Sequence, residues 1–200
     1  MDPDDAAGPR RRDAAATRQA LLQAARGRFV RLGYERTTLR DVAADVGVNL
    51  ALIKRYFGSK EGLFKAALAA TPRFGGGTGE FPRDRAALAE ALSHQLSAGA
   101  WPEYGEHPVL MLLRVTGDER VDSLRRQALA DFSRRVLEAS GQDDDGLLRA
   151  QLLVALGVGI AVVRSAVGLQ PLTGATSGDL VGPLRDVVDG LLGPRAEPGN

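Results

Sequence analysis

The feature that constrains this chain most is the stretch 37–57, which is typical of two short helices joined by a glycine. Thr38 is a favourable N-cap, and Asp41 three positions later completes a capping box. Gly47 stands where the first helix should end in a left-handed residue, a conformation that glycine adopts without a steric penalty. Asn49 then caps the second helix. The local signals therefore predict helix, tight turn and helix.

The spacing of small and apolar residues in this stretch indicates how the two helices pack. Ala43 is small where they should cross, and Leu52, Ile53 and Phe57 can pack back onto the first helix. The distance from Ala43 through Gly47 to Ile53 is typical of a helix-turn-helix, whose second helix enters the DNA major groove. Any two short helices joined by glycine look similar, so the spacing alone leaves a purely structural hairpin open.

The residues on either side of this stretch favour a DNA-binding helix-turn-helix over a purely structural hairpin. The segments Gly33–Thr38 and Tyr56–Phe64 resemble the N-terminal domain of the tetracycline-repressor (TetR) family. The resemblance runs from about residue 17 to residue 68, and from Pro108 onward the chain resembles the C-terminal domains of that family more loosely. Two departures stand out: Lys54 replaces the usual Tyr of the recognition helix, and Leu50-Ala51 replaces the polar or small residues at its start.

The resemblance implies an all-α fold, with a three-helix helix-turn-helix domain followed by a helical domain for ligand binding and dimerisation. Glycine- and proline-rich segments divide the chain further. We expect a disordered basic arm (1–12), a DNA-binding domain (13–70), a linker loop (71–82), a regulatory and dimerisation domain (83–193) and a disordered tail (194–200).

Composition excludes several classes of protein. Hydrophobic residues make up 44% and charged residues 26% of the chain, as is usual for a globular protein. Cysteine is absent, which excludes disulfides, cysteine zinc sites and thiol catalysis. The longest uncharged apolar run, 150–163, is shorter than the roughly 20 residues needed to span a bilayer, and residues 1–12 lack the apolar segment of a secretory signal. We expect a cytoplasmic protein with no cofactor, no metal and no membrane partner.

Charge is distributed unevenly. Residues 1–60 contain 12 Lys/Arg against 7 Asp/Glu, and residues 61–200 contain 14 against 18. A basic N-terminal third suits a protein that touches nucleic acid at one end. The excess is small enough to arise from random scatter, so it supports the motif and does not replace it.

Two sets of residues are expected to contact double-stranded DNA. The resemblance implies phosphate contacts by three side chains, and Lys54 supplies a charge where the family has a phosphate-contacting Tyr. Base reading is expected from Arg, which prefers guanine, from Asn, which prefers adenine, and from Leu, which contacts the thymine methyl. The phosphate set is Thr38, Lys54, Tyr56 and Lys60, and the base-reading set is Arg40, Asn49, Leu50 and Arg55.

The C-terminal half carries two further expectations. The helices at 147–169 and 176–192 are so apolar that a second copy of the chain should cover them, in a homodimer. We expect the interface to include Leu152, Leu156, Gly157, Ile160, Val163, Leu184, Val188 and Leu191. A local concentration of aromatic and polar residues indicates an effector site, with ordinary core filling as the alternative. This set is His94, Trp101, Tyr104, His107, Met111 and Arg114, and its ligand is expected to be mostly apolar, with an anionic group allowed.

An enzyme is the first alternative, and it fits the sequence less well. The two histidines, His94 and His107, have no carboxylate or hydroxyl partner at a spacing recognisable as catalytic. A helical interaction module that has lost DNA binding is a second alternative, although it would not be expected to keep a basic set on the reading helices. The resemblance implies a repressor released from a palindromic operator by a small molecule; an activator, or a regulator without ligand control, stays open.

Overall fold

The computed structural model describes residues 8–69, 81–100, 107–113, 118–143 and 146–194. Within these ranges the chain is helical and contains no strand, which confirms the all-α fold. The elements are α1 (Gly8–Arg36), α2 (Leu39–Val46), α3 (Leu50–Phe57), α4 (Lys60–Ala69), α5 (Arg85–Leu96), η1 (Pro108–Leu112), α6 (Glu119–Ser140), α7 (Leu147–Val162), η3 (Val163–Val167), η4 (Leu172–Gly174) and α8 (Ser177–Leu192).

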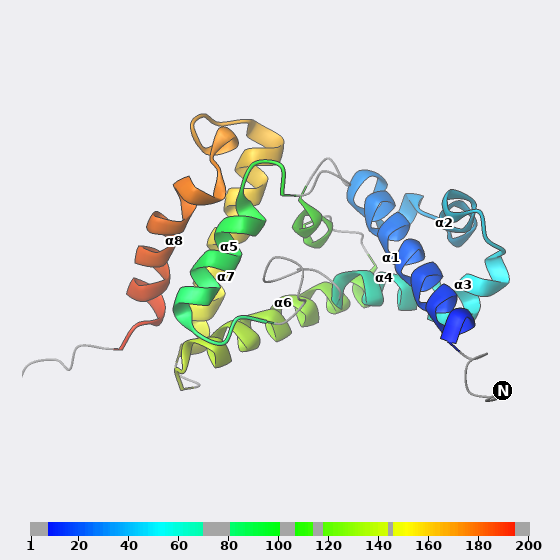
Figure 1. Ribbon diagram of the computed structural model, residues 1–200, viewed down its shortest axis with the longest axis horizontal. Coiled ribbons are helices and arrows are strands. Elements are labelled where there is room, and N and C mark those ends of the chain that lie inside the picture. Colours follow the sequence, from blue (N-terminus) through cyan, green and yellow to red (C-terminus); the bar gives the residue numbers. More distant parts are fainter. Residues whose placement is uncertain (1–7, 70–80, 101–106, 114–117, 144–145, 195–200) are drawn as a thin grey trace, which may run out of the picture.

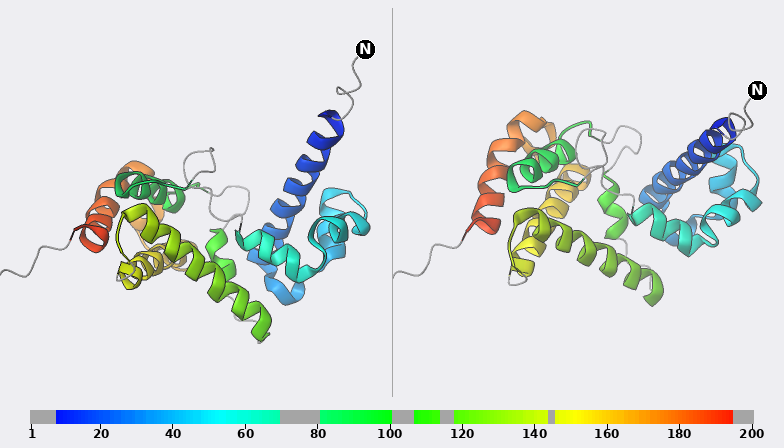
Figure 2. Two further views of the ribbon diagram at one scale, coloured as in Figure 1. Left: turned by 90° about the horizontal axis from the view of Figure 1, so that it is seen from below. Right: turned by 60° about the horizontal axis from the view of Figure 1, so that its bottom comes forward.

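The helices form two groups at opposite ends of the molecule (Figure 1). Helices α1 to α4 lie together at one end, and α5, α7 and α8 at the other. Helix α6 runs along the molecule from the C-terminal group toward α4, as both views of Figure 2 show, and it contacts both α4 and α7. The C-terminal group therefore reaches the N-terminal one through α6 and the short helix η1.

Helix α1 is longer than the sequence predicted. It begins at Gly8, so residues 8–12 are helical where we expected part of a disordered arm, while residues 1–7 lie outside the described ranges. The predicted stop at Gly33 appears as a break with φ 81° and ψ 175°, after which helical structure resumes to Arg36. The Thr37 hydroxyl donates to the Gly33 carbonyl at 2.8 Å and stabilises this break.

The core of α1 to α4 is completed by residues from the C-terminal half. Phe29, Ile53 and Phe64 are among its fully buried side chains, and Met111 of η1 and Val121 of α6 are buried in the same cluster. Arg125 of α6 reaches this region too, with its guanidinium 5.8 Å from the centre of the Phe64 ring. The expected boundary at 71–82 thus separates the chain in sequence, although the apolar packing crosses it.

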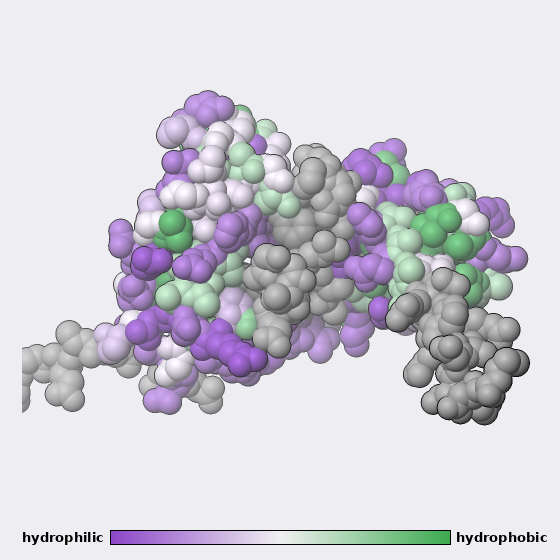
Figure 3. Space-filling view, in the orientation of Figure 1, coloured by the Kyte–Doolittle hydropathy of each residue, from purple (hydrophilic) through white to green (hydrophobic). Residues whose placement is uncertain are grey.

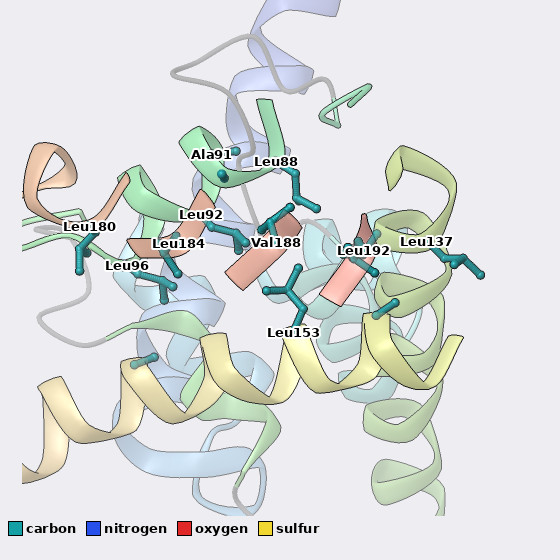
Figure 4. Close-up of a cluster of buried hydrophobic side chains, with 14 residues drawn as sticks. Leu88, Ala91, Leu92, Leu96, Leu137, Leu153, Leu180, Leu184, Val188 and Leu192 are labelled. Carbon is teal, nitrogen blue, oxygen red and sulfur yellow. The ribbon is translucent and has the colours of Figure 1, made fainter. Parts of the chain in front are cut away.

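A second core holds the C-terminal helices together. Helices α5 and α8 pack along each other over α7, and Figure 4 shows Leu184 and Val188 lying among Leu92, Leu96 and Leu153. Leu184 and Val188 were expected at a dimer interface; both are buried inside their own chain, where a second copy cannot contact them. The face of α8 that carries these two residues is covered by helices of the same chain.

Helix α7 exposes much of its apolar surface. Leu148 is 67%, Leu152 51% and Leu156 38% exposed, in a row at intervals of four residues. With the π-helical turn η3, the helical segment Leu147–Val167 is long and apolar enough by length and composition to cross a membrane, and only 17% of its most apolar window is buried. The uncharged run in the sequence underestimated this segment because the helix continues through Arg164.

Candidate functional site

Helices α2 and α3 form the predicted helix-turn-helix. The Thr38 hydroxyl accepts from the Asp41 N–H at 3.1 Å, and the Thr38 N–H donates to the Asp41 carboxylate at 3.3 Å, which confirms the capping box. Gly47 ends α2 with φ 70°, where a side chain would be strained. The Asn49 side-chain oxygen Oδ1 accepts from the Ala51 N–H at 2.9 Å and caps α3. The turn is therefore fixed from both sides by local hydrogen bonds.

An ion pair that no local sequence pattern indicates fixes α2 against α1. Arg28 donates to both carboxylate oxygens of Asp45, at 2.5 and 2.7 Å, and lies 3.9 Å from Asp41. The hydrogen bond from Arg28 lowers the pKa of Asp45, and the hydrogen bond from Thr38 is the main cause of a lowered pKa at Asp41. Arg28 and Asp45 are 17 residues apart, so their pairing depends on how α1 and α2 pack.

The backbones of α3 and α4 lie close together where the two helices join. A Cβ on Gly62 would lie 2.0 Å from the Phe57 carbonyl oxygen, so only glycine fits there. The Gly62 N–H donates to the Ser59 hydroxyl at 3.0 Å, which caps α4. Arg18 of α1 lies over the Phe57 ring, 5.3 Å from its centre, and connects α1 with α3. Helix α3 is thus fixed at both ends.

The outer surface of this unit carries most of the residues expected at DNA. Thr38, Arg40, Asn49, Lys54 and Arg55 are exposed, while Leu50 and Tyr56 are half-buried. Figure 3 shows apolar as well as polar surface at the end formed by α2 and α3. An exposed helix with two cations and an apolar start is a surface that DNA phosphates and base edges can meet.

Lys60 is partly engaged within its own chain. Its ammonium donates to the Glu35 carbonyl at 3.1 Å and lies 4.3 Å from the centre of the Tyr34 ring. Burial lowers the pKa of Lys60, against the opposing field of Glu35. An ammonium has three N–H donors, so this hydrogen bond leaves two for a phosphate.

A second candidate site is a cavity in the C-terminal half. It has a volume of about 90 Å³ and lies among α5, η1, α6 and α7, with Leu68 of α4 in its wall. His107 and Met111 line it, as expected. His94 does not, because α5 turns Leu92, Gln95 and Leu96 toward the cavity and leaves position 94 exposed. The other expected residues, Trp101, Tyr104 and Arg114, lie outside the described ranges.

Comparison with known proteins assigns both halves of the chain. Residues 21–67 match the family described as bacterial regulatory proteins, tetR family. Residues 87–192 match the tetracyclin repressor-like C-terminal domain. The chain belongs to the TetR family. Members are DNA-binding transcriptional regulators rather than enzymes, so the helix-turn-helix is the DNA-binding part of such a regulator.

Among solved structures, the chain is similar to a TetR-family regulator from Streptomyces coelicolor A3. The two are 24% identical over 89% of this chain and 95% of that chain, with a TM-score of 0.46. No curated protein matches this chain.

The Arg28–Asp45 pair makes a prediction for acid stability. Because the folded pKa of Asp45 is lowered, the pair stabilises the fold above the unfolded pKa of about 3.8 and loses that effect as pH falls through the folded pKa. Asp45→Asn should lower stability at pH 7 by about 0.2–1 kcal/mol, the range for exposed ion pairs. Denaturant unfolding from pH 7 to pH 2.5 should show its difference from wild type vanishing in acid. Asp186→Asn, at an exposed carboxylate on α8, is the control; an Asp45→Asn difference independent of pH contradicts the assignment.

Proposed function

We propose that this TetR-family regulator is a homodimeric, cytoplasmic repressor that binds a palindromic operator and releases it when a small molecule enters the C-terminal cavity. Control of DNA binding by a ligand is supported by one observation: the cavity and the core of α1 to α4 have side chains in common. Leu68 and Met111 both line the cavity and belong to the core beneath the helix-turn-helix.

The proposed DNA contacts use the exposed face of α2 and α3 and the start of α4. Lys54, Thr38, Tyr56 and Lys60 contact phosphates, whereas Arg40, Asn49, Leu50 and Arg55 read bases. The side-chain oxygen Oδ1 of Asn49 already caps α3, so the NH₂ group of the same side chain is the part left for a base acceptor. Leu50 offers only apolar contact, most usefully to a thymine methyl, which favours A·T pairs nearby.

The proposed dimer uses the exposed row on α7. Leu152 and Leu156 are exposed as a dimer contact requires, and Leu148 extends the row by one turn. Ile160 and Leu191 pack partly against the chain's own core, and Gly157 lines the cavity, so these residues lie beside the surface rather than at its centre. Burying three exposed leucines against a second copy is favourable at about 25 cal/mol per Å² of apolar surface.

Release from DNA follows if the ligand binds the state with a larger cavity more tightly than the DNA-binding state. A ligand that enlarges the cavity displaces Leu68 or Met111, and with them α4 and the helices packed on it. A tenfold loss of operator affinity requires the ligand to prefer the displaced state by about 1.4 kcal/mol.

Replacing Lys54 tests whether the exposed face of α2 and α3 contacts DNA. On DNA selected from random sequence, which should show two-fold symmetry, Lys54→Ala should weaken binding to all sites. It should also lower the salt slope by roughly one unit for each phosphate that the lysine no longer neutralises. Binding is measured by anisotropy at several salt concentrations. Lys65→Ala, an exposed lysine on α4 that faces α6, is the matched control. Equal behaviour of the two variants, or selected sites without symmetry, would refute this face.

Leu152 tests the dimer. Leu152→Asp places a charge at the centre of the proposed contact, where it would be buried without a partner, so it should convert a dimer into a monomer at micromolar concentration. Leu113→Asp makes the same change at an exposed leucine outside α7 and should leave the dimer intact. Analytical ultracentrifugation reads both, and a wild-type monomer at that concentration contradicts the proposal.

A further inference from the structure

The C-terminal cavity is almost entirely hydrocarbon. Sixteen residues line it, and all but Gln95 and His107 are apolar. Among the described residues its lining contains no Asp, Glu, Lys or Arg. A charged group placed there would lose its hydration without gaining an ion-pair partner from this lining, which is strongly unfavourable.

The histidine in the wall adds no charge. Its Nδ1 accepts a hydrogen bond from the Val109 N–H at 3.1 Å, which requires that nitrogen to be unprotonated. Burial is the main cause that lowers the pKa of His107 to about 4; the charge of Arg164 also lowers it, and a hydrogen bond with the Gln95 backbone opposes the shift. The ring is therefore neutral at physiological pH, and its orientation is set by its own chain.

Among the described residues, the cations close to the cavity lie outside its lining. Arg164 donates to the backbone carbonyls of Leu96, Thr173 and Ala175 and does not line the space. Lys65 and Arg135 line a neighbouring cleft between α4 and α6, together with Asp131, and are absent from the cavity wall.

The space can grow toward that cleft. Cavity and cleft share three residues, Leu68, Ala128 and Phe132, and the cleft has a volume of about 190 Å³. An apolar cavity of about 150 Å³ is large enough to bind benzene. A ligand of that size fits once the side chains of Leu68 and Phe132 move, and the movement of Leu68 acts on α4.

We infer that the cavity binds a compact, uncharged, largely hydrocarbon molecule, and that its lining, among the described residues, disfavours the anionic group that the sequence alone allows. The effect of such a ligand on DNA rests on the proposed function, whereas its binding does not.

A matched set of probes tests the inference on the full-length protein. Toluene and benzyl alcohol are uncharged, while benzoate and benzylammonium carry opposite charges on the same ring. The chain has two methionines, Met1 and Met111, so the ¹³C-labelled methyl of Met111 reports occupancy of the cavity directly by NMR. The uncharged probes should shift this signal saturably, and both charged probes should bind at least tenfold more weakly.

A variant pair locates the binding. A Cβ on Gly157 meets only Leu96, at 3.9 Å, so Gly157→Leu should fill the cavity and abolish toluene binding. Gly190→Leu makes the same change at an exposed position of α8, where nothing lies within 4 Å of the added Cβ, and should leave binding unchanged. Should Gly157→Leu fail to fold, the wild-type Met111 titration still decides the question.

Operator binding measured in parallel separates the two proposals. Failure of both uncharged probes to shift the Met111 signal, or binding of either charged probe as tight as that of benzyl alcohol, overturns the inference. Uncharged probes that bind the cavity and leave operator affinity unchanged support the inference and contradict ligand-controlled release. A charged probe that binds the cavity as tightly as benzyl alcohol and releases DNA overturns the inference and supports ligand-controlled release.

Discussion

Burial of Met111 and Val121 in the core of α1 to α4 is the contact on which the rest of the structure depends. A unit of about 60 residues buries only some 60% of the surface that its unfolded chain exposes, so a few more buried side chains matter to its stability. Here two of them come from η1 and α6. The helices that carry the DNA-reading face are therefore held partly by residues of the regulatory half.

This packing gives the protein a direct physical route between its two sites. Met111 contacts the N-terminal core and also lines the C-terminal cavity, and Leu68 does the same from α4. Arg125 of α6 adds a contact across the junction, because its guanidinium lies near the Phe64 ring, while its ion pair with Asp122 at 2.6 Å lies within α6. A change in the volume of the cavity acts on Leu68, which belongs to α4, and on Met111 of η1, which contacts α1.

The sequence predicted what local chemistry determines. The capping box at Thr38, the left-handed Gly47 and the cap at Asn49 each involve residues within a few positions of one another, and all are present. The helix-turn-helix and the TetR family followed from these signals and their flanks, and the family matches confirm both.

Local sequence signals do not identify contacts between residues that are far apart in the chain. Arg28 and Asp45 are ordinary surface residues until α1 and α2 are placed side by side. Leu184 and Leu152 both recur at helical spacing, which identifies an apolar face but not whether the same chain or a second copy covers it. For the same reason, aromatic and polar residues close together in sequence drew His94 into the expected effector site, although the turn of α5 directs it outward.

Native-state hydrogen exchange of wild type and Met111→Ala tests the shared core most directly. Truncating a buried Met to Ala costs about 2–5 kcal/mol, which is a factor of at least about 30 in the exchange of amides that open with it. If the core is shared, protection should fall together in α1, α4 and α6. Wild-type protection in α1 and α4, with faster exchange confined to η1 and α6, would show that the DNA-reading helices are stable without the regulatory half.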